Sequence, residues 1–485
     1  MASLSLESQL AAWEASLPVE RELTDSSQIP QLQKVADEMV ASGLATEAMM
    51  VIVSEPKKWK ETLLCATYLV ESAAQMSQCP PMHITVVHAL FKETKRIKKS
   101  SEHKSGQDFV RNKVAQLKWL FEKHAPAGSS WNYLGVDDGC PDGSGKALQA
   151  VADKEGYKNV KAIFLEDAIE QKLPPFDKLE STEDSKKGGA VLYGLIKGAS
   201  TLVPSNLKHI VAYCDADLSA DLGMLGLLAH PILMGGSCVA VGQRYGCPGS
   251  FLVDDQGPLP DPESVWNLRD RVRMAFRHFA RGLILPDIAH VPDTQCAFKA
   301  LHAKVCAEIA PQVQSFGAGF DMELLCRSAA TSKISLVPIV FVEDNEDSAF
   351  SSTADKSNEN YFKMIGEVMK MRKRGVGVSL SVMPGSLGDA QEWLAFIQTL
   401  KIASFKKMIT GLENKLGPHP PGGLYCNFDL QECKKFAFGL DDAMEARVME
   451  QAYFIWKNEG KEDAVANYYS ALKIESSLLE RATNA

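Results

Sequence analysis

Residues 209–219 read HIVAYCDADLS, an apolar run that ends in two aspartates, Asp215 and Asp217. A short run rich in β-branched and aromatic residues that stops at acidic residues is typical of a buried strand. Helical patterns and further apolar runs alternate along the chain. The other apolar runs lie at 84–90, 131–136, 160–165, 237–242 and 334–342, and the helical patterns include 108–124, 188–200 and 265–282. This alternation predicts an α/β fold whose mainly parallel sheet is covered by helices on both faces.

Helical patterns also dominate both flanks of the alternating region. Apolar residues recur at helical spacing over 31–50 and 60–76, and an amphipathic helix with a basic last turn is predicted over 360–374. We therefore expect three parts along the chain. These are an N-terminal helical extension (1–80), an α/β domain (81–376) and a mostly helical C-terminal region (377–485).

Composition narrows the classes of function. The 485 residues are 45% hydrophobic and 23% charged, which indicates a globular chain of enzyme size. With a formal net charge of −9, the chain lacks the positive field that nonspecific nucleic-acid binding requires, so no nucleic-acid partner is expected. Eleven scattered cysteines without a CxxC pair indicate reduced thiols. The first residues do not form a secretory signal, and a cytoplasmic protein is therefore expected.

One stretch is long enough to be considered as a membrane span. Residues 222–242 carry no charged side chain at neutral histidine. His230-Pro231 and Gly235-Gly236 interrupt the stretch at mid-length, which disfavours an isolated membrane helix. We interpret it as a short helix followed by a buried strand, so membrane contact is expected to be peripheral at most.

Three polar motifs lie where predicted strands end, at the edge where open α/β sheets bind ligands. Asp215 and Asp217 fall on one side of an extended backbone, which suits Mg or Mn held against a diphosphate, unless they only cap the next helix. The segment VDDGCPDGSG (136–145) is acidic and glycine-rich, as ordinary turns also are. In KKGGA (186–190), lysines and helix-opening amides suit phosphate or sugar oxygens, although a solvated basic loop has the same pattern.

The ordered set of motifs resembles the family 2 glycosyltransferases, which have the GT-A nucleotide-sugar fold. Within that family it is most similar to the polyprenyl-phosphate and dolichyl-phosphate glucosyl- or mannosyltransferases. The resemblance covers residues 83–374 and depends on the order of all the motifs together. They are VDDGCPDG (136–143), KKGGAVLYG (186–194), YCDADLS (213–219), VGQR (241–244), the arginine-rich helix 265–282, DTQCAFK (293–299) and GFDMELL (319–325).

The resemblance implies a GT-A enzyme that moves a hexose from a UDP- or GDP-sugar with Mg or Mn. Asp215 and Asp217 would hold the metal against the diphosphate. The remaining donor contacts are implied for five residues. These are Asp137 and Asp138 at the base and ribose, Lys187 and Gly188 near the nucleotide or sugar, and Arg244 near the diphosphate or an acceptor phosphate.

The resemblance also implies a general base. Asp293 is the first choice for deprotonating the acceptor, with inversion at the anomeric carbon. Asp321 and Glu323 are second choices, and Asp321 has an equal alternative as the N-cap of a helix.

Departures from the family pattern leave the acceptor and the stereochemistry open. His88 stands where the family has a proline, while Glu93 keeps the family's acidic residue, and an insertion at 246–262 lengthens the loop on the acceptor side. The expected acceptor is a phosphate or hydroxyl compound. Because no membrane anchor is predicted, a soluble acceptor stays open beside a lipid phosphate. Three alternatives remain: a retaining glycerate-type sugar synthase, a sugar-phosphate nucleotidyltransferase, and a non-catalytic scaffold that binds sugar nucleotides.

Overall fold

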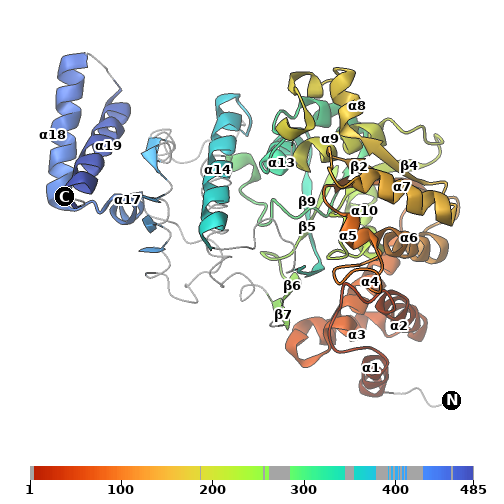
Figure 1. Cartoon of the computed structure of the whole chain (residues 1–485). Coiled ribbons are helices and arrows are strands. Elements are labelled where there is room, and N and C mark those ends of the chain that lie inside the picture. The colour runs from red at the N-terminus through yellow and green to blue at the C-terminus, as the bar shows by residue number, and fades with distance from the viewer. Residues whose placement is uncertain are drawn as a thin grey trace. The chain divides into compact units, whose positions relative to one another are not determined.

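The computed structural model of this chain describes residues 5–185, 187–254, 257–260, 285–344, 354–377, 430–459 and 463–483, with some helical residues between 392 and 415. The chain divides into two compact units (Figure 1). The first unit comprises residues 1–264 and 291–348, and the second comprises residues 265–290 and 349–485. All the residues proposed above for the site belong to the first unit.

A seven-stranded sheet forms the centre of the first unit. Its strands are β1 (Met82–Leu90), β2 (Ser130–Asp137), β3 (Val160–Phe164), β4 (Lys208–Tyr213), β5 (Val239–Gln243), β8 (Lys299–His302) and β9 (Ile334–Pro338). They lie in the order β3-β2-β1-β4-β8-β5-β9. All neighbouring pairs are parallel except those made by β8, which runs antiparallel to β4 and to β5. The predicted mainly parallel α/β sheet is therefore confirmed.

Helices cover both faces of this sheet. A Cβ at Gly194 would lie 2.2 Å from Val87, whereas a Cβ at Gly135 would lie 2.6 Å from Leu148. Because Gly135 pairs with His88, the residue after Val87, these contacts lie on opposite faces of the sheet. The helices that carry Gly194 and Leu148 are α9 (Lys187–Ala199) and α7 (Ser144–Glu155). Gly194 thus allows α9 to lie directly on β1.

The remaining elements of the first unit connect or flank these layers. The helices are α5 (Thr94–Ile97), α6 (Phe109–Trp119), the π-helix η2 (Leu120–His124), α8 (Leu165–Glu170), α10 (Leu225–Leu233), α12 (Ala303–Ile309) and α13 (Phe320–Thr331). The 3-10 turns are η1 (Pro56–Lys58), η3 (Phe176–Lys178), η4 (Thr182–Asp184), η5 (Leu222–Met224) and η9 (Ala310–Gln312). The helices predicted over 108–124 and 188–200 correspond to α6 with η2 and to α9.

The N-terminal helices pack into the same unit as the sheet. They are α1 (Leu6–Ala15), α2 (Gln28–Ser42), α3 (Ala45–Ser54) and α4 (Glu61–Ser77). The pattern predicted over 31–50 divides at Gly43, whose φ of 73° ends α2. Helix α4 is tied to the α/β layers because the Ser72 hydroxyl donates to the Gly223 carbonyl at 2.6 Å and accepts from the Gly226 amide at 3.0 Å. The helical extension is thus part of the core that supports the sheet.

The uncharged segment 222–242 forms helix α10, with Pro231 inside it, and then strand β5. A helix that meets the length and apolarity needed to cross a membrane does not occur in the described part of the chain. The run 334–342, predicted as one strand, is two strands in different sheets. Strand β9 ends at Pro338, and β10 (Val340–Val342) joins a small sheet with β6 (Phe251–Asp254) and β7 (Gly257–Pro260). The described part of the insertion 246–262 supplies β6 and β7.

The second unit is helical in its described parts. Its elements are η8 (Pro286–Ile288), α14 (Ala354–Lys373), α17 (Leu430–Phe438), α18 (Asp442–Glu459) and α19 (Ala464–Thr483). Helix α14 contains the helix predicted over 360–374. The arginine-rich helix predicted over 265–282 lies outside the described residues.

Candidate functional site

The direction in which successive strands are added to the sheet reverses between β1 and β4. The chain leaves β1 toward β2 and β3 and returns to place β4 on the other side of β1. In doubly wound sheets such a reversal opens a crevice outside the carboxyl ends of the two strands, where ligands bind. The segments that follow are Phe91–Glu93 after β1 and Cys214–Asp217 after β4. The predicted metal motif therefore follows one of the two strands at this reversal.

Carboxylates from both segments gather there. Burial raises the pKa of Glu93 to about 7; Arg96 counteracts this effect, and the nearby Asp217 and Asp215 add to it. The Arg96 guanidinium lies 3.0 Å from Glu93 Oε2 and 3.1 Å from Asp344 Oδ2. Negative charge is thus concentrated around Arg96 at this end of the strands.

His88 stands where the glycosyltransferases that the sequence resembles have a proline. It supports the backbone of the Asp215–Asp217 turn. Its buried ring places Nδ1 3.0 Å from the carbonyl oxygen of Cys214 and 3.1 Å from that of Asp215. Two acceptors facing one ring nitrogen require that nitrogen to carry the proton. Burial and Lys113 lower the pKa of His88 to about 3, so the ring is neutral. A proline at this position would have no side-chain donor for these two carbonyl groups.

Asp215 and Asp217 have different electrostatic surroundings. The Lys187 ammonium pairs with Asp215 Oδ1, while Asp217 Oδ1 accepts from the Ser219 amide at 3.1 Å. Burial opposes ionisation of Asp215, but Lys187 and other nearby cations together outweigh burial and lower the pKa of this carboxyl. Burial and the neighbouring Asp215 both raise the pKa of Asp217. A cation brought to the pair would relieve this repulsion.

The donor set of this pair suits a hard divalent cation. Carboxylate oxygens are preferred ligands of Mg2+ and Mn2+. Within the ranges that the structure describes, His, Cys, Asp and Glu side chains do not form a metal-holding group of three or more. The two aspartates therefore fit part of a coordination shell that a ligand phosphate and water would complete.

Residues before and within α6 brace the same turn. Gln107 accepts from the Leu218 amide at 3.0 Å and donates to Asp344 Oδ2 at 2.9 Å. The fully buried Lys113 donates from Nζ to the Ala220 carbonyl at 3.0 Å. Sequence reasoning missed both residues. The only local signal was a polar side chain at Lys113 between the apolar positions Val110 and Val114 of the predicted helix.

The two aspartates at the end of β2, Asp137 and Asp138, have different roles. Both oxygens of Asp137 accept backbone amides, from Cys140 and from Gly145, each at 2.7 Å. Asp137 therefore shapes the turn, as the alternative interpretation of this segment expected. Asp138 Oδ1 accepts from the Ser185 hydroxyl at 3.0 Å, and burial raises its pKa to about 7. Asp138 also lies near β1, because its amide donates to the Leu90 carbonyl at 3.1 Å.

Lys187 and Gly188 begin α9 beside this region. The Lys187 side chain is 48% exposed and reaches Asp215. A Cβ at Gly188 would lie 2.5 Å from the Phe316 carbonyl oxygen. The contact that requires a glycine at 188 is thus a close approach of two backbone segments.

Arg244 grips Asp293 with two parallel hydrogen bonds. Its Nε lies 2.6 Å from Oδ2 and its Nη2 lies 3.0 Å from Oδ1, and the Tyr245 hydroxyl donates to Oδ1 at 3.0 Å. Asp293 is completely buried, whereas the Arg244 side chain is 16% exposed. Both oxygens of the candidate base are thus engaged in this arrangement, and Asp293 orients Arg244.

Asp321 and Glu323 form ion pairs inside the fold. Asp321 Oδ1 accepts from Lys299 Nζ at 2.6 Å and from the Tyr213 hydroxyl. Glu323 accepts from the Ser315 hydroxyl at 2.6 Å and from Arg327 Nη2 at 2.8 Å. Asp321 thus links α13 to the end of β4 and to the start of β8, whereas these two hydrogen bonds of Glu323 lie within α13 and the loop before it.

The chain is similar to several solved structures at low sequence identity. No family model matches it, and no curated protein matches it. Among solved structures, it is similar to glucosyl-3-phosphoglycerate synthase of Mycobacterium tuberculosis, with 15% identity over 64% of this chain and 86% of that chain and a TM-score of 0.37. The synthase in complex with Mn2+ and uridine-diphosphate-glucose gives 16% identity, 64% and 84% coverage and a TM-score of 0.36. A mannosyltransferase from Pyrobaculum calidifontis in complex with GDP-Man and Mn2+ gives 11% identity, 89% and 98% coverage and a TM-score of 0.37.

Proposed function

We propose that this chain is a metal-dependent glycosyltransferase that moves a hexose from a UDP- or GDP-sugar to a phosphate or hydroxyl acceptor. The observation that carries the proposal is the paired Asp215 and Asp217 at the β1–β4 reversal, with Lys187 on one of them. A sheet reversal provides a place for the nucleotide, paired carboxylates provide metal ligands, and a lysine provides a phosphate partner.

Mg or Mn would be held by Asp215 and Asp217. When bound, such an ion offsets the negative charge that develops on the leaving nucleoside diphosphate. Lys187 and Arg244 would add positive charge at the diphosphate, and both already counteract the charge of Asp215. Positioning and charge stabilisation would then supply most of the rate enhancement.

The nucleotide would lie over the ends of β1 and β2. Asp138 is the better candidate of the two aspartates for a contact with the nucleotide base or ribose, since both oxygens of Asp137 accept hydrogen bonds from backbone amides. Gly188 would serve the site indirectly, because it allows the Phe316 backbone to pack closely against the start of α9.

Asp293 is the proposed general base for an inverting transfer. Arg244 would have to exchange this carboxylate for a donor phosphate oxygen before Asp293 could accept a proton from the acceptor. Because Arg244 binds both Asp293 oxygens, a retaining transfer is the alternative mechanism. Asp321, paired with Lys299, is a weaker candidate for proton transfer.

The decisive experiment measures binding and hydrolysis of UDP-glucose, GDP-mannose and UDP-N-acetylglucosamine with and without Mn2+. We expect Mn2+-dependent binding of one of them. Asp217→Asn should remove it, while the exposed Asp142→Asn in the neighbouring turn should not. Absence of binding by every sugar nucleotide in both conditions would overturn the proposal and favour the scaffold alternative.

A further inference from the structure

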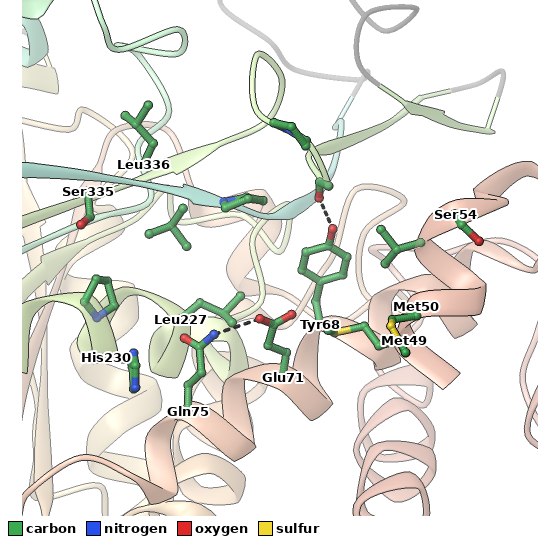
Figure 2. Close-up of a pocket in the computed structure, with 16 residues that line it drawn as sticks. Met49, Met50, Ser54, Tyr68, Glu71, Gln75, Leu227, His230, Ser335 and Leu336 are labelled. Carbon is green, nitrogen blue, oxygen red and sulfur yellow. Dashed lines mark hydrogen bonds between the residues drawn. The ribbon is translucent and has the colours of Figure 1, made fainter. Parts of the chain in front are cut away.

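A cavity lies at the β9 edge of the sheet, and none of the residues proposed for the transferase site lines it. Its volume is about 630 Å3, and α3, α4, α10, β9 and the loop around Gly249 line it (Figure 2). Volumes between about 300 and 1,000 Å3 are typical of sites for small organic ligands. All of its lining residues belong to the first compact unit.

Most of this lining is apolar. The apolar contributors are Met49, Met50, Val53, Leu227, Pro231, Pro248, Leu336, Val337 and Pro338. Met50 is 60% exposed, and a methionine at the edge of a cavity can adapt its shape to an apolar ligand. The cavity wall is also fixed across the fold, since the Tyr68 hydroxyl donates to the Gly249 carbonyl. This hydrogen bond joins two walls of the cavity, α4 and the loop around Gly249.

Glu71 places a carboxylate in this apolar surface. Its Oε1 accepts from Gln75 Nε2 at 2.9 Å, and both side chains project from α4 between the methionines and His230 (Figure 2). Burial raises the pKa of Glu71, which Gln75 offsets only in part. Among the residues that the structure describes, no lysine or arginine pairs with Glu71. A partly buried carboxylate without a cation costs free energy that a cationic ligand would recover.

We propose that this cavity binds a small, mainly apolar molecule that carries one ammonium group, with the ammonium at Glu71. The apolar portion would lie against the methionines, prolines and Leu227. Charge complementarity selects an ammonium over a carboxylate, and the apolar lining selects an alkyl or similar body over a sugar. This site is separate from the nucleotide-sugar site, and its occupancy does not depend on the proposed transferase activity.

The test compares three probes of equal chain length that differ only in the head group. Octylammonium, octanol and octanoate are titrated calorimetrically into the full-length protein in the absence of sugar nucleotide. We expect octylammonium to bind about tenfold more tightly than octanol, as a charged hydrogen bond contributes more than a neutral one. We expect octanoate to bind most weakly. Equal binding of all three probes, tighter binding of octanoate, or no binding at all would overturn the proposal.

Variants then locate the binding. Glu71→Gln should bring octylammonium to the affinity of octanol, while Glu47→Gln on the exposed surface of α3 removes the same charge and should leave the preference unchanged. Val53→Phe should fill the cavity and weaken octylammonium and octanol together. If Glu71→Gln lowers the melting temperature, the wild-type preference and Val53→Phe still decide the question. An unchanged preference in a folded Glu71→Gln variant would contradict the assignment.

Discussion

The Nδ1 atom of His88 lies 3.0 Å from the carbonyl oxygen of Cys214, and the same atom lies 3.1 Å from the next carbonyl, that of Asp215. One neutral imidazole thus fixes two successive peptide groups at the start of the Asp215–Asp217 turn. We infer that His88 positions this turn for metal and diphosphate without touching either.

Replacing His88 tests this positioning role. An asparagine keeps an amide donor near the Nδ1 position, while a leucine leaves two buried carbonyl groups without that donor. We expect His88→Leu to lower the free energy of unfolding by about 1–3 kcal/mol and to weaken Mn2+-dependent donor binding. His88→Asn should restore most of the donor binding. Denaturant unfolding and Mn2+ titrations check both, and equal Mn2+ dependence in the two variants would contradict the role.

Asp217→Asn separates function from stability. Burial and Asp215 raise the pKa of Asp217, so its ionised form adds repulsion to the folded chain. We expect the variant to lose donor binding by more than about tenfold while its stability stays equal or rises slightly. Calorimetric titration of the donor with Mn2+ and thermal unfolding provide the two measurements. Donor binding that survives unchanged would exclude Asp217 as a metal ligand.

Asp138 predicts a pH dependence of stability. Burial raises its pKa from an ordinary value of 3.8 to about 7, so the folded state favours the protonated carboxyl. The contribution of Asp138 to the free energy of unfolding is therefore fully present below pH 3.8 and is lost as the pH rises toward and through 7. Between these limits, the free energy of unfolding of the wild type should fall by up to about 4 kcal/mol relative to that of Asp138→Asn. Urea unfolding across this pH range measures it, and parallel curves for the two proteins would refute the assignment.

Substitutions in the Arg244–Asp293 pair test whether Asp293 acts as a general base or only orients Arg244. If Asp293 is the base, Asp293→Asn should lower kcat by about 100-fold or more while donor affinity changes little. We expect this result, with a stability loss because Arg244 then lacks its buried partner. Arg244→Lys should instead weaken donor binding, since lysine cannot replace the two-pronged contact. Equal losses of donor affinity and kcat in Asp293→Asn would show that Asp293 acts only by orienting Arg244.

Gly188 tests the packing at the start of α9. A Cβ there would meet the Phe316 carbonyl at 2.5 Å, and a backbone oxygen cannot move aside cheaply. We expect Gly188→Ala to lower stability by about 1–3 kcal/mol. The matched control is Gly366→Ala in α14, where a Cβ would meet nothing within 4 Å and should raise stability by up to about 1 kcal/mol. Thermal unfolding distinguishes them, and an unaffected Gly188→Ala would remove the packing explanation.

Local patterns in the sequence were sufficient for most of the fold. Apolar runs predicted β1 and β4 closely, and helical spacing predicted α4, α6 and α9, because both periodicities depend on residues a few positions apart. Strand β8 was missed. It has four residues, two of them Lys299 and His302, and it exists through antiparallel pairing with β4 and β5, which are distant in sequence.

The same distinction applies to the site. The sequence by itself determined that acidic residues follow the strands, and so it located Asp215 and Asp217 at the end of β4. Only the tertiary structure decided what each carboxylate contacts. Asp293 meets Arg244 across 49 residues and Asp321 meets Lys299 across 22, while His88 reaches Cys214 across 126. A carboxylate's role depends on the cations and donors around it, and these partners are brought together only when the sheet assembles.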